Sequence, residues 1–368
     1  MRAQGGARGG GAAARPGALP NERVIHVAKE GGAEFTTVGD ALASVPPSAA
    51  GPILISIGPG VYSEKLRIDR PNVRLAGAGR HSTILRYDDH AKRLLPSGEP
   101  MGTFNSYTLY VGGIDFEARD LSVENSAGDG RLVGQAVACY VDADRASFFR
   151  CGFAARQDTL CLGPLPANPI PKGLNTTHPV AIAGQSGRRE LFRHYFRECR
   201  IEGDIDFIFG SAAALFEDCE ILSLERGETV NGYIAAPSTL PGQAYGFVFL
   251  RCRLKGSAGK GSVFLGRPWR PTAKAAFIDC ELGDHIAAEG WDNWGNPANE
   301  RGAEFAEFGS RGPCAPAGFA EPGSGPSPSA GRRAAWARVL DPGDVSRFTP
   351  RAILSGDDGW SPWLDRRL

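Results

Sequence analysis

A pattern of apolar positions and cysteines recurs along the middle of this chain. The pattern is Phe-x-x-Cys-x-apolar, found at Phe148–Phe153, Phe196–Ile201, Phe216–Ile221, Phe249–Leu254 and Phe277–Leu282, with a copy lacking the cysteine at Phe116–Leu121. Its cysteines are 48, 20, 33 and 28 residues apart, whereas helical repeats keep a fixed length. Coils of a parallel β-helix vary in this way, because loops of different length leave the turns while the strands stay in register. The pattern therefore predicts an all-β chain with a parallel β-helix fold.

Short apolar segments between turn residues agree with this fold. They are Val73–Leu75, Val137–Val141, Phe207–Phe209, Phe247–Leu250 and Ala275–Ile278. Their β-branched and aromatic residues, bounded by Gly, Asp, Asn or Pro, are typical of strands. Helical periodicity occurs only near the ends. Residues 36–45 predict a short N-terminal helix that caps the open end of the stack, and residues 346–354 predict a short C-terminal helix.

Two Pro- and Gly-rich segments interrupt the repeats. Removing about 27 residues from the segment 162–190 would shorten the longest cysteine spacing to about 21, close to the 20 of the next coil, so we expect an insertion there. Residues 309–332 are a low-complexity mixture typical of a surface loop. We expect residues 1–20 to be disordered and residues 21–368 to form one domain.

Composition narrows the range of partners. The chain has 41 basic and 41 acidic residues, and this balance does not favour nucleic acid, which requires a basic face. No apolar run has the length of a signal-peptide core or a transmembrane helix. We expect a monomer without a membrane partner. It is expected to be cytoplasmic as the chain is written, and secreted if the N-terminus is incomplete or trimmed.

The eight cysteines fall into three groups. Five occupy the repeat position, and we expect a ladder of small buried side chains. Cys139 and Cys161 are 22 residues apart, the same separation as Gln135 and Gln157, so they are candidates to stack as well, as free thiols or as a disulfide. Cys314 lies in a loop. Because no Cys-x-x-Cys pair occurs, no zinc site is expected.

Two aspartates occupy the same position of the repeat. Asp158 follows Cys151 by seven residues, and Asp206 follows Cys199 by seven. Matching positions of stacked coils lie about 4.8 Å apart, so the repeat predicts that the two carboxylates are neighbours. Such a pair is a candidate general acid and nucleophile. Taken singly, each aspartate is equally explained as a turn residue beside a strand.

Further polar and aromatic side chains stand near this pair. Gln157 precedes Asp158, Gln135 lies one coil earlier, and Arg267 is two residues before Trp269. Together they supply two amide donors, one cation and one flat apolar surface, which suits recognition of a polar substrate. The purely structural alternative for the last two is a loop in which the arginine stacks on the indole.

Blocks of sequence in a fixed order resemble the pectin methylesterase (pectinesterase) family. The blocks are Gly60-Val61-Tyr62-Ser63-Glu64, Thr103-Phe104-Asn105-Ser106, Ala118-Arg119-Asp120-Leu121, Asn125-Ser126-Ala127-Gly128, Gln135-Ala136-Val137-Ala138, Gln157-Asp158-Thr159-Leu160, Asp206-Phe207-Ile208-Phe209-Gly210, Leu265-Gly266-Arg267-Pro268-Trp269 and Gly290-Trp291 with Trp294. They span about residues 24–362. The resemblance implies a single-stranded right-handed parallel β-helix. It also implies a carboxylic ester hydrolase that demethylates galacturonate units of pectin or oligogalacturonides and releases methanol.

The resemblance also implies catalytic roles. Asp206 would be the nucleophile that attacks the methyl ester, and Arg267 would hold it ionised and oriented. Asp158 would be the general acid that protonates methanol and then the base that activates water. Gln157, assisted by Gln135, would donate hydrogen bonds to the oxyanion.

Substrate contacts follow from the same resemblance. Trp269 would stack on the sugar ring, while Thr103, Gln135 and Arg267 would contact the substrate, methyl-esterified homogalacturonan or an oligogalacturonide. The implied chemistry uses no metal and no cofactor.

The chain departs from the family pattern near these residues. The family usually has tyrosine at the position of Cys161 and leucine at that of Cys139, so we expect different local packing. Cys161 is an alternative nucleophile, although no histidine lies near it in sequence. Residues 162–190 exceed the insertion of plant members and resemble that of some bacterial members. We hypothesise that they wall one end of the cleft and favour short oligogalacturonides.

Other functions are compatible with a parallel β-helix. Pectate lyases need a calcium-binding carboxylate cluster, and polygalacturonases need aspartates that activate water at a glycosidic bond, and neither group is evident here. An esterase or thioesterase acting on another acyl group is an alternative. A non-catalytic β-helix that binds polysaccharide is another, although it would be expected to lack one aspartate or the arginine.

Overall fold

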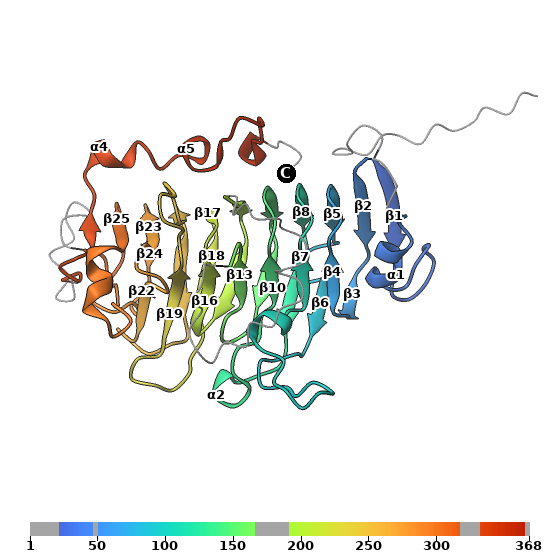
Figure 1. The fold of residues 1–368 in the computed structure, drawn as a ribbon, viewed down its shortest axis with the longest axis horizontal. Coiled ribbons are helices and arrows are strands. Elements are labelled where there is room, and N and C mark those ends of the chain that lie inside the picture. The colour runs from blue at the N-terminus through green and yellow to red at the C-terminus, as the bar shows by residue number, and fades with distance from the viewer. Residues whose placement is uncertain (1–21, 47–50, 166–190, 317–331, 365–368) are drawn as a thin grey trace, which may run out of the picture.

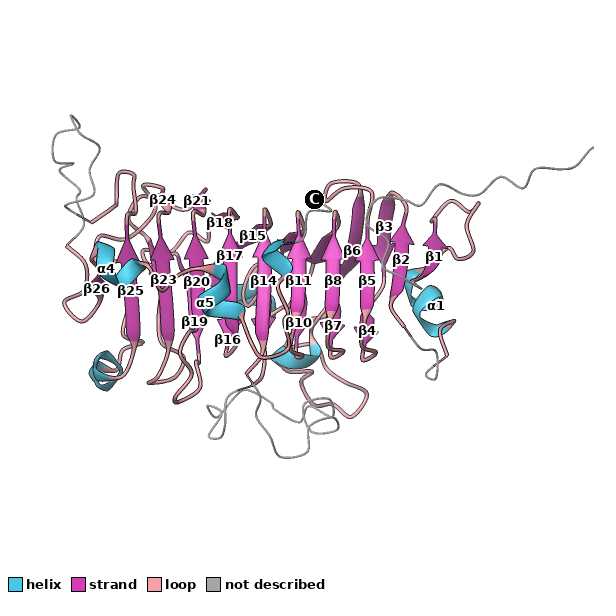
Figure 2. Ribbon diagram, turned by 90° about the horizontal axis from the view of Figure 1, so that it is seen from above, coloured by secondary structure: helices cyan, strands magenta, loops and turns pink. Residues whose placement is uncertain are grey.

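Three parallel β-sheets run side by side along a stack of coils in the computed structural model (Figure 1, Figure 2). It describes residues 22–46, 51–165, 191–316 and 332–364. The fold is an all-β right-handed parallel β-helix, as predicted. The predicted N-terminal disordered segment, most of the predicted insertion and most of the low-complexity loop lie outside the described residues.

The strands formed by the described residues divide among the sheets as follows. Sheet A contains eleven strands in the order β1 (Arg23–Val27), β2 (Ile53–Ile57), β5 (Val73–Ala76), β8 (Phe116–Arg119), β11 (Ala146–Phe149), β14 (Arg193–Arg197), β17 (Ala213–Glu217), β20 (Phe247–Leu250), β23 (Lys274–Ile278), β25 (Glu304–Phe308) and β26 (Arg338–Val339). Sheet B contains eight, β3 (Gly60–Ser63), β6 (Thr83–Tyr87), β9 (Ser122–Asn125), β12 (Gly152–Ala154), β15 (Arg200–Gly203), β18 (Glu220–Ser223), β21 (Arg253–Gly256) and β24 (Glu281–Leu282). Sheet C contains seven, β4 (Leu66–Ile68), β7 (Leu109–Val111), β10 (Cys139–Val141), β13 (Leu160–Leu162), β16 (Ile205–Gly210), β19 (Gly232–Pro237) and β22 (Val263–Gly266).

The phenylalanines of the repeat form a column inside the coils. The rings of Phe148, Phe196, Phe216, Phe249 and Phe277 stack in that order, with neighbouring centroids 4.7, 4.8, 4.7 and 4.2 Å apart. This separation matches the spacing between adjacent strands, so each ring covers the next one along the stack. The repeat therefore marks one buried position on successive coils.

The cysteines of the repeat form the predicted ladder of small buried side chains. All eight cysteines lie within the described residues, are buried and are free thiols. Cys199 donates its Sγ–H to the carbonyl of Phe148 on the preceding coil (3.4 Å), and Cys252 does the same to Phe216 (3.3 Å). The thiols therefore satisfy backbone acceptors while filling small volumes of the core.

The expected stacking of Cys139 and Cys161 is wrong. Cys139 pairs with Leu160, and Tyr140 pairs with Cys161. A one-residue offset in a parallel ladder sends two side chains to opposite faces of the sheet. Cys139 accordingly belongs to the interior core, whereas Cys161 packs among aromatic rings on the outer face of sheet C.

The repeat copy assigned to Phe116–Leu121 is displaced by two residues. Ala118, and not Phe116, pairs with Phe148. The next coil begins its strand with Gly152, whose N–H donates to Leu121 O (2.9 Å). Leu121 therefore takes the place that cysteine holds in the other coils.

A short helix covers the N-terminal end of the stack (Figure 1). Helix α1 (Val38–Ala43) begins after Thr37, whose side chain accepts a hydrogen bond from Asp40 N (3.1 Å). Val38 and Ala41 are buried in the interior core. The predicted capping helix is therefore confirmed, with bounds shorter than the sequence pattern indicated.

Of the C-terminal helix predicted over residues 346–354, only the second half is helical, and a separate short helix precedes it. The two helices are α4 (Pro342–Val345) and α5 (Pro350–Leu354), and the second begins at Pro350 because Thr349 caps its first turn. In the described ranges, the other helical segments are α2 (Gly130–Val133) and the 3-10 turns Thr103–Asn105, Pro297–Arg301 and Pro362–Leu364. Among the described residues no helix has both the length and the apolar character needed to span a membrane.

The C-terminal segment runs back across the outer face of sheet A (Figure 2). Leu340, Ile353 and Leu354 are buried there in one cluster with Tyr195 and Leu215. The C-terminal segment therefore covers an apolar part of the outer face of sheet A.

Candidate active site

Asp158 and Asp206 lie at matching positions on neighbouring coils of sheet C. Strand β13 pairs with β16 so that Leu160 stands opposite Ile208, two residues after each aspartate. The N–H of Asp158 donates to the carbonyl of Ile205 (3.0 Å). Both carboxylates therefore leave the stack at the same edge, in the register that the repeat indicates.

The backbone at both aspartates has a left-handed conformation. The φ angle is 65° at Asp158 and 48° at Asp206, a region that aspartate tolerates better than most residues. Between Ile205 and Ile208 strand β16 also carries a bulge against β19. A bulge changes the direction in which a side chain points, and residues with a left-handed backbone are concentrated at functional sites. Both features favour side chains that point away from the hydrogen-bonded strands of sheet C.

Gly210 closes the apolar strand that follows Asp206. Its φ is 125°, and a Cβ atom there would lie 2.0 Å from Leu162 O. No other residue fits this close approach of two strands, which explains the glycine that ends this block.

Arg267 binds Asp206 with two parallel hydrogen bonds. Its Nε and Nη2 atoms donate to Oδ1 at 2.8 Å and Oδ2 at 2.7 Å. Such bidentate pairs fix geometry as well as charge. Burial opposes the charged form of Arg267, but the charge and the hydrogen bonds of Asp206, together with Tyr233 and Asp292, outweigh it and leave the pKa of Arg267 raised.

Two aromatic rings enclose the guanidinium of Arg267. Its central carbon lies 3.8 Å from the ring centroid of Tyr233 and 3.9 Å from that of Trp294. Arg267 does not stack on Trp269, where the structural alternative placed it, and Arg270 lies over that ring instead (5.0 Å). The sequence contained no signal for Tyr233, and Trp294 stood out only as part of a family block.

The environment of Asp158 favours its protonated form. Burial, and next the negative charge of Asp206, raise the pKa of Asp158 well above its usual range, while Arg267 opposes this shift. Because Arg267 binds Asp206 directly, the arginine stabilises the charge of that partner. The two carboxyl groups are therefore suited to hold one proton and one negative charge between them.

All seven site residues predicted from the sequence line one cavity of about 700 Å³. They are Thr103, Gln135, Gln157, Asp158, Asp206, Arg267 and Trp269. None of the hydrogen bonds among the described residues uses the carboxamide of Gln135 or Gln157. Among the described residues, both amides therefore keep their donors for a bound molecule.

Aromatic side chains form the apolar part of this cavity. Trp269 packs edge-on against Phe209, with centroids 5.9 Å apart and planes at 63°, and Phe104 lies beside Phe209 (6.5 Å). Cys161 belongs to the same cluster and is fully buried. Burial raises the pKa of its thiol well above the usual range, which argues against Cys161 as a nucleophile.

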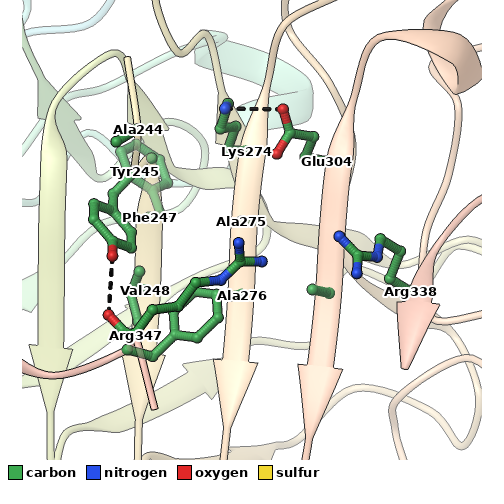
Figure 3. Close-up of a pocket in the computed structure, with 13 residues that line it drawn as sticks. Ala244, Tyr245, Phe247, Val248, Lys274, Ala275, Ala276, Glu304, Arg338 and Arg347 are labelled. Atoms are coloured by element: carbon green, nitrogen blue, oxygen red, sulfur yellow. Dashed lines mark hydrogen bonds and ion pairs between the residues drawn. The ribbon is translucent and has the colours of Figure 1, made fainter. Parts of the chain in front are cut away.

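A second cavity, of about 150 Å³, lies on the outer face of sheet A near the C-terminal segment (Figure 3). Tyr245 and Phe348 form one wall, and Tyr245 donates its hydroxyl to Arg347 O (2.9 Å). The one acidic residue that lines it in the described part of the chain, Glu304, is ion-paired with Lys274 (2.8 Å). This cavity therefore lacks the carboxylate pair of the larger one.

Comparison with known proteins places the chain in a family. The family model described as Pectinesterase matches residues 24–163 and 189–357, which leaves out residues 164–188 inside the expected insertion. Pectinesterase 31 of Arabidopsis thaliana is 30% identical over 357 residues, which are 95% of this chain and 98% of that relative. Probable pectinesterase 56 of the same plant is 34% identical over 283 residues, covering 74% of this chain and 86% of that relative.

Solved structures agree in fold. A pectin methylesterase in complex with a hexasaccharide is similar, with a TM-score of 0.72, 28% identity and coverage of 93% of this chain and 98% of that one. Pectin methylesterase PemA from Erwinia chrysanthemi gives a TM-score of 0.71, 27% identity and coverage of 94% and 99%. The chain thus belongs to the pectinesterase family of carboxylic ester hydrolases.

Proposed function

We propose that this protein demethylates methyl-esterified galacturonate units of pectin or oligogalacturonides, with Asp206 as nucleophile and Asp158 as acid and base. The observation that carries the proposal is the bidentate Arg267–Asp206 pair beside a buried Asp158 in one cavity. Membership of the pectinesterase family supports ester hydrolysis, and the hexasaccharide bound to a related structure supports a sugar chain as substrate.

The first half of the reaction forms an acyl-enzyme. A carboxylate oxygen of Asp206 attacks the ester carbonyl at C6, and the carbonyl oxygen becomes an oxyanion that accepts hydrogen bonds from Gln157 and Gln135. Collapse of this intermediate breaks the bond to the methoxy group. Asp158 gives its proton to the leaving oxygen, so methanol departs and a mixed anhydride joins Asp206 to the sugar.

The second half restores the enzyme. Asp158, now ionised, takes a proton from water, and the hydroxide attacks the C6 carbonyl. The bond to Asp206 breaks, which releases galacturonate and the free carboxylate that Arg267 stabilises. The raised pKa of Asp158 suits this residue to the two proton transfers, since it must be protonated when methanol leaves.

The remaining cavity residues would position the sugar. Trp269 and Phe209, which follow the two aspartates in the chain, offer the apolar surface on which a sugar ring stacks. Thr103 and Gln135, which precede them in the chain, offer polar contacts. A cavity of about 700 Å³ suits a segment of chain longer than one sugar unit.

Methanol release tests the proposed reaction. The substrates are highly methylated pectin and a methylated trigalacturonate, and Asp206→Ala serves as the inactive control. We expect release from both substrates by the wild type and none by the variant. A folded wild type that releases no methanol from either would redirect the assignment to another acyl group.

Two alternatives lose support at the site. A binding protein without activity has no need of two neighbouring buried carboxylates, of which, among the described residues, only Asp206 is ion-paired, because their burial costs stability. A pectate lyase requires a cluster of acidic metal ligands, and in the described part of the chain no three His, Cys, Asp or Glu side chains are grouped in this way.

A further inference from the structure

A buried acid lies two residues before the proposed nucleophile. Asp204 is 1% exposed, and its Oδ1 accepts the N–H of Ile205 (2.7 Å). The same oxygen lies 3.5 Å from Arg226 Nη1, and its Oδ2 lies 4.0 Å from Arg156 Nη1. Because a buried carboxylate needs a partner, Arg226 is held in place by the charge of Asp204.

The Arg226 guanidinium and the Gln157 carboxamide lie beside the same glycine, Gly130. A Cβ atom on Gly130 would lie 3.2 Å from Gln157 Oε1 and 3.4 Å from Arg226 Nη1, so both atoms border the small space that this glycine leaves open. The Nη1 atom is buried and has no hydrogen-bond partner among the described residues, although it faces Asp204 at ion-pair distance. The backbone of Arg226 is fixed through its N–H, which donates to Asn231 Oδ1 (2.7 Å).

We infer that Arg226 is a positioning residue that sets the direction of the Gln157 carboxamide. A carboxamide has an acceptor at one end and two N–H donors at the other, whereas a guanidinium has donors only. Arg226 therefore favours the orientation in which Gln157 Oε1 faces it and Nε2 is free to donate to the oxyanion. The reversed amide would set N–H groups of both side chains against each other. This inference rests on the proposed oxyanion role of Gln157.

A double-mutant cycle tests the inference. The measured quantities are kcat and KM for methanol release from methylated pectin by the wild type, Gln157→Ala, Arg226→Ala and the double variant. We expect kcat to fall about 100-fold in Gln157→Ala and about tenfold in Arg226→Ala, with KM within about twofold. In the Gln157→Ala background, Arg226→Ala should change kcat by less than about twofold, because it acts only through Gln157.

Additional variants separate positioning from stability. Arg226→Ala leaves Asp204 buried without its nearer partner, so the variant is expected to lose stability. Adding Asp204→Asn removes that charge and should restore the thermal midpoint but not kcat. Arg156→Ala is the matched control, since it removes the other arginine near Asp204, and its Nη1 donates to Glu225 O (2.8 Å). This control should keep kcat within about twofold of the wild type.

Two outcomes would overturn the inference and leave Gln157 in its role. One is an equal loss of kcat from Arg226→Ala in both backgrounds, and the other is full recovery of kcat when Asp204→Asn is added. An unchanged kcat in Gln157→Ala is a different failure. It would remove Gln157 from the proposed mechanism, and the inference about Arg226 with it.

Discussion

Arg267 is constrained in its plane by a carboxylate and on each face by an aromatic ring. Asp206 accepts two hydrogen bonds from it, while Tyr233 and Trp294 lie 3.8 and 3.9 Å from its central carbon. Only a planar cation fits between two rings and still presents two parallel N–H groups. The proposed nucleophile is therefore held in one orientation before substrate binds, which lowers the reorganisation needed for attack.

Replacing Arg267 by lysine tests whether the function of Asp206 depends on the bidentate geometry of the arginine or only on its positive charge. Lysine keeps the charge but loses the bidentate contact and the stacking, so we expect kcat to fall about 100-fold. Methanol release measures the effect, with the thermal midpoint as a control for folding. A lysine variant within about threefold of wild-type kcat would show that charge alone suffices.

His194 makes stability depend on pH. It is fully buried with Nε2 2.9 Å from Ala143 O, and burial lowers its pKa to about 4. In the unfolded chain histidine titrates near pH 6.5, so between about pH 6.5 and 4 the unfolded chain binds more protons and stability falls as pH falls. We expect this residue to reduce the free energy of unfolding by about 2 kcal/mol between pH 7 and 5.

Urea unfolding of the wild type and His194→Gln at both pH values measures this contribution. The variant lacks the titrating group, so its stability should depend less on pH than that of the wild type. Equal pH dependence in the two proteins would assign the effect to other groups.

The carboxylates and amides of the site could be predicted from the sequence because each has a fixed position in the repeat. Asp158 and Asp206 could be aligned by counting from a buried cysteine. Tyr233 could not be found this way, since its role depends on a ring packing against an arginine 34 positions later. Arg226 was missed for the same reason, because a loop rather than a repeat places it beside Gly130, next to which Gln157 also lies.

At the level of elements, stacked side chains link each coil to the next. The phenylalanine column and the cysteine ladder both lie in the interior core. The sequence predicted the register between neighbouring coils, meaning which residues pair, less well than any other feature of the stack. A one-residue offset between β10 and β13 separated Cys139 from Cys161, and the Phe116 copy was displaced by two residues. Such offsets arise at turns and bulges, which leave no mark in an apolar pattern.

Phe216 tests the contribution of the column. It is fully buried and stacked between Phe196 and Phe249. We expect Phe216→Ala to lower the free energy of unfolding by about 3–5 kcal/mol, since a large cavity would remain. Leu132→Ala is the control, because Leu132 is 77% exposed and should change stability by less than about 0.5 kcal/mol. If the two substitutions changed the free energy of unfolding equally in denaturant unfolding, the stacked phenylalanines would not contribute specially to stability.

Across the whole molecule, the candidate site and the covered apolar face lie on different sheets. Sheet C carries the cavity, whereas the outer face of sheet A is covered by the C-terminal segment. That segment is tied down by Asp358, which is ion-paired with Arg193 and Arg145. We therefore expect the C-terminal segment to stabilise the fold and to have no effect on catalysis.

Removing residues 342–368 tests this division. The truncation would expose Tyr195, Leu215 and Ile278 on sheet A, so we expect a lower thermal midpoint and stronger binding of a hydrophobic dye. Below the new midpoint, KM for methylated pectin should stay within about twofold of the full chain. A large rise in KM with an unchanged midpoint would show that the segment serves the site and not the fold.

The most direct test of the carboxylate pair is methanol release from highly methylated pectin by Asp206→Asn and Asp158→Asn, each compared with the wild type. Both substitutions keep the size of the side chain, and circular dichroism checks that both variants are folded. We expect no detectable release from Asp206→Asn, which has no carboxylate nucleophile, and a loss of at least about 100-fold in Asp158→Asn, which has no acidic proton to donate. A folded Asp206→Asn enzyme that releases methanol at the wild-type rate would contradict the assignment of this pair as the catalytic centre.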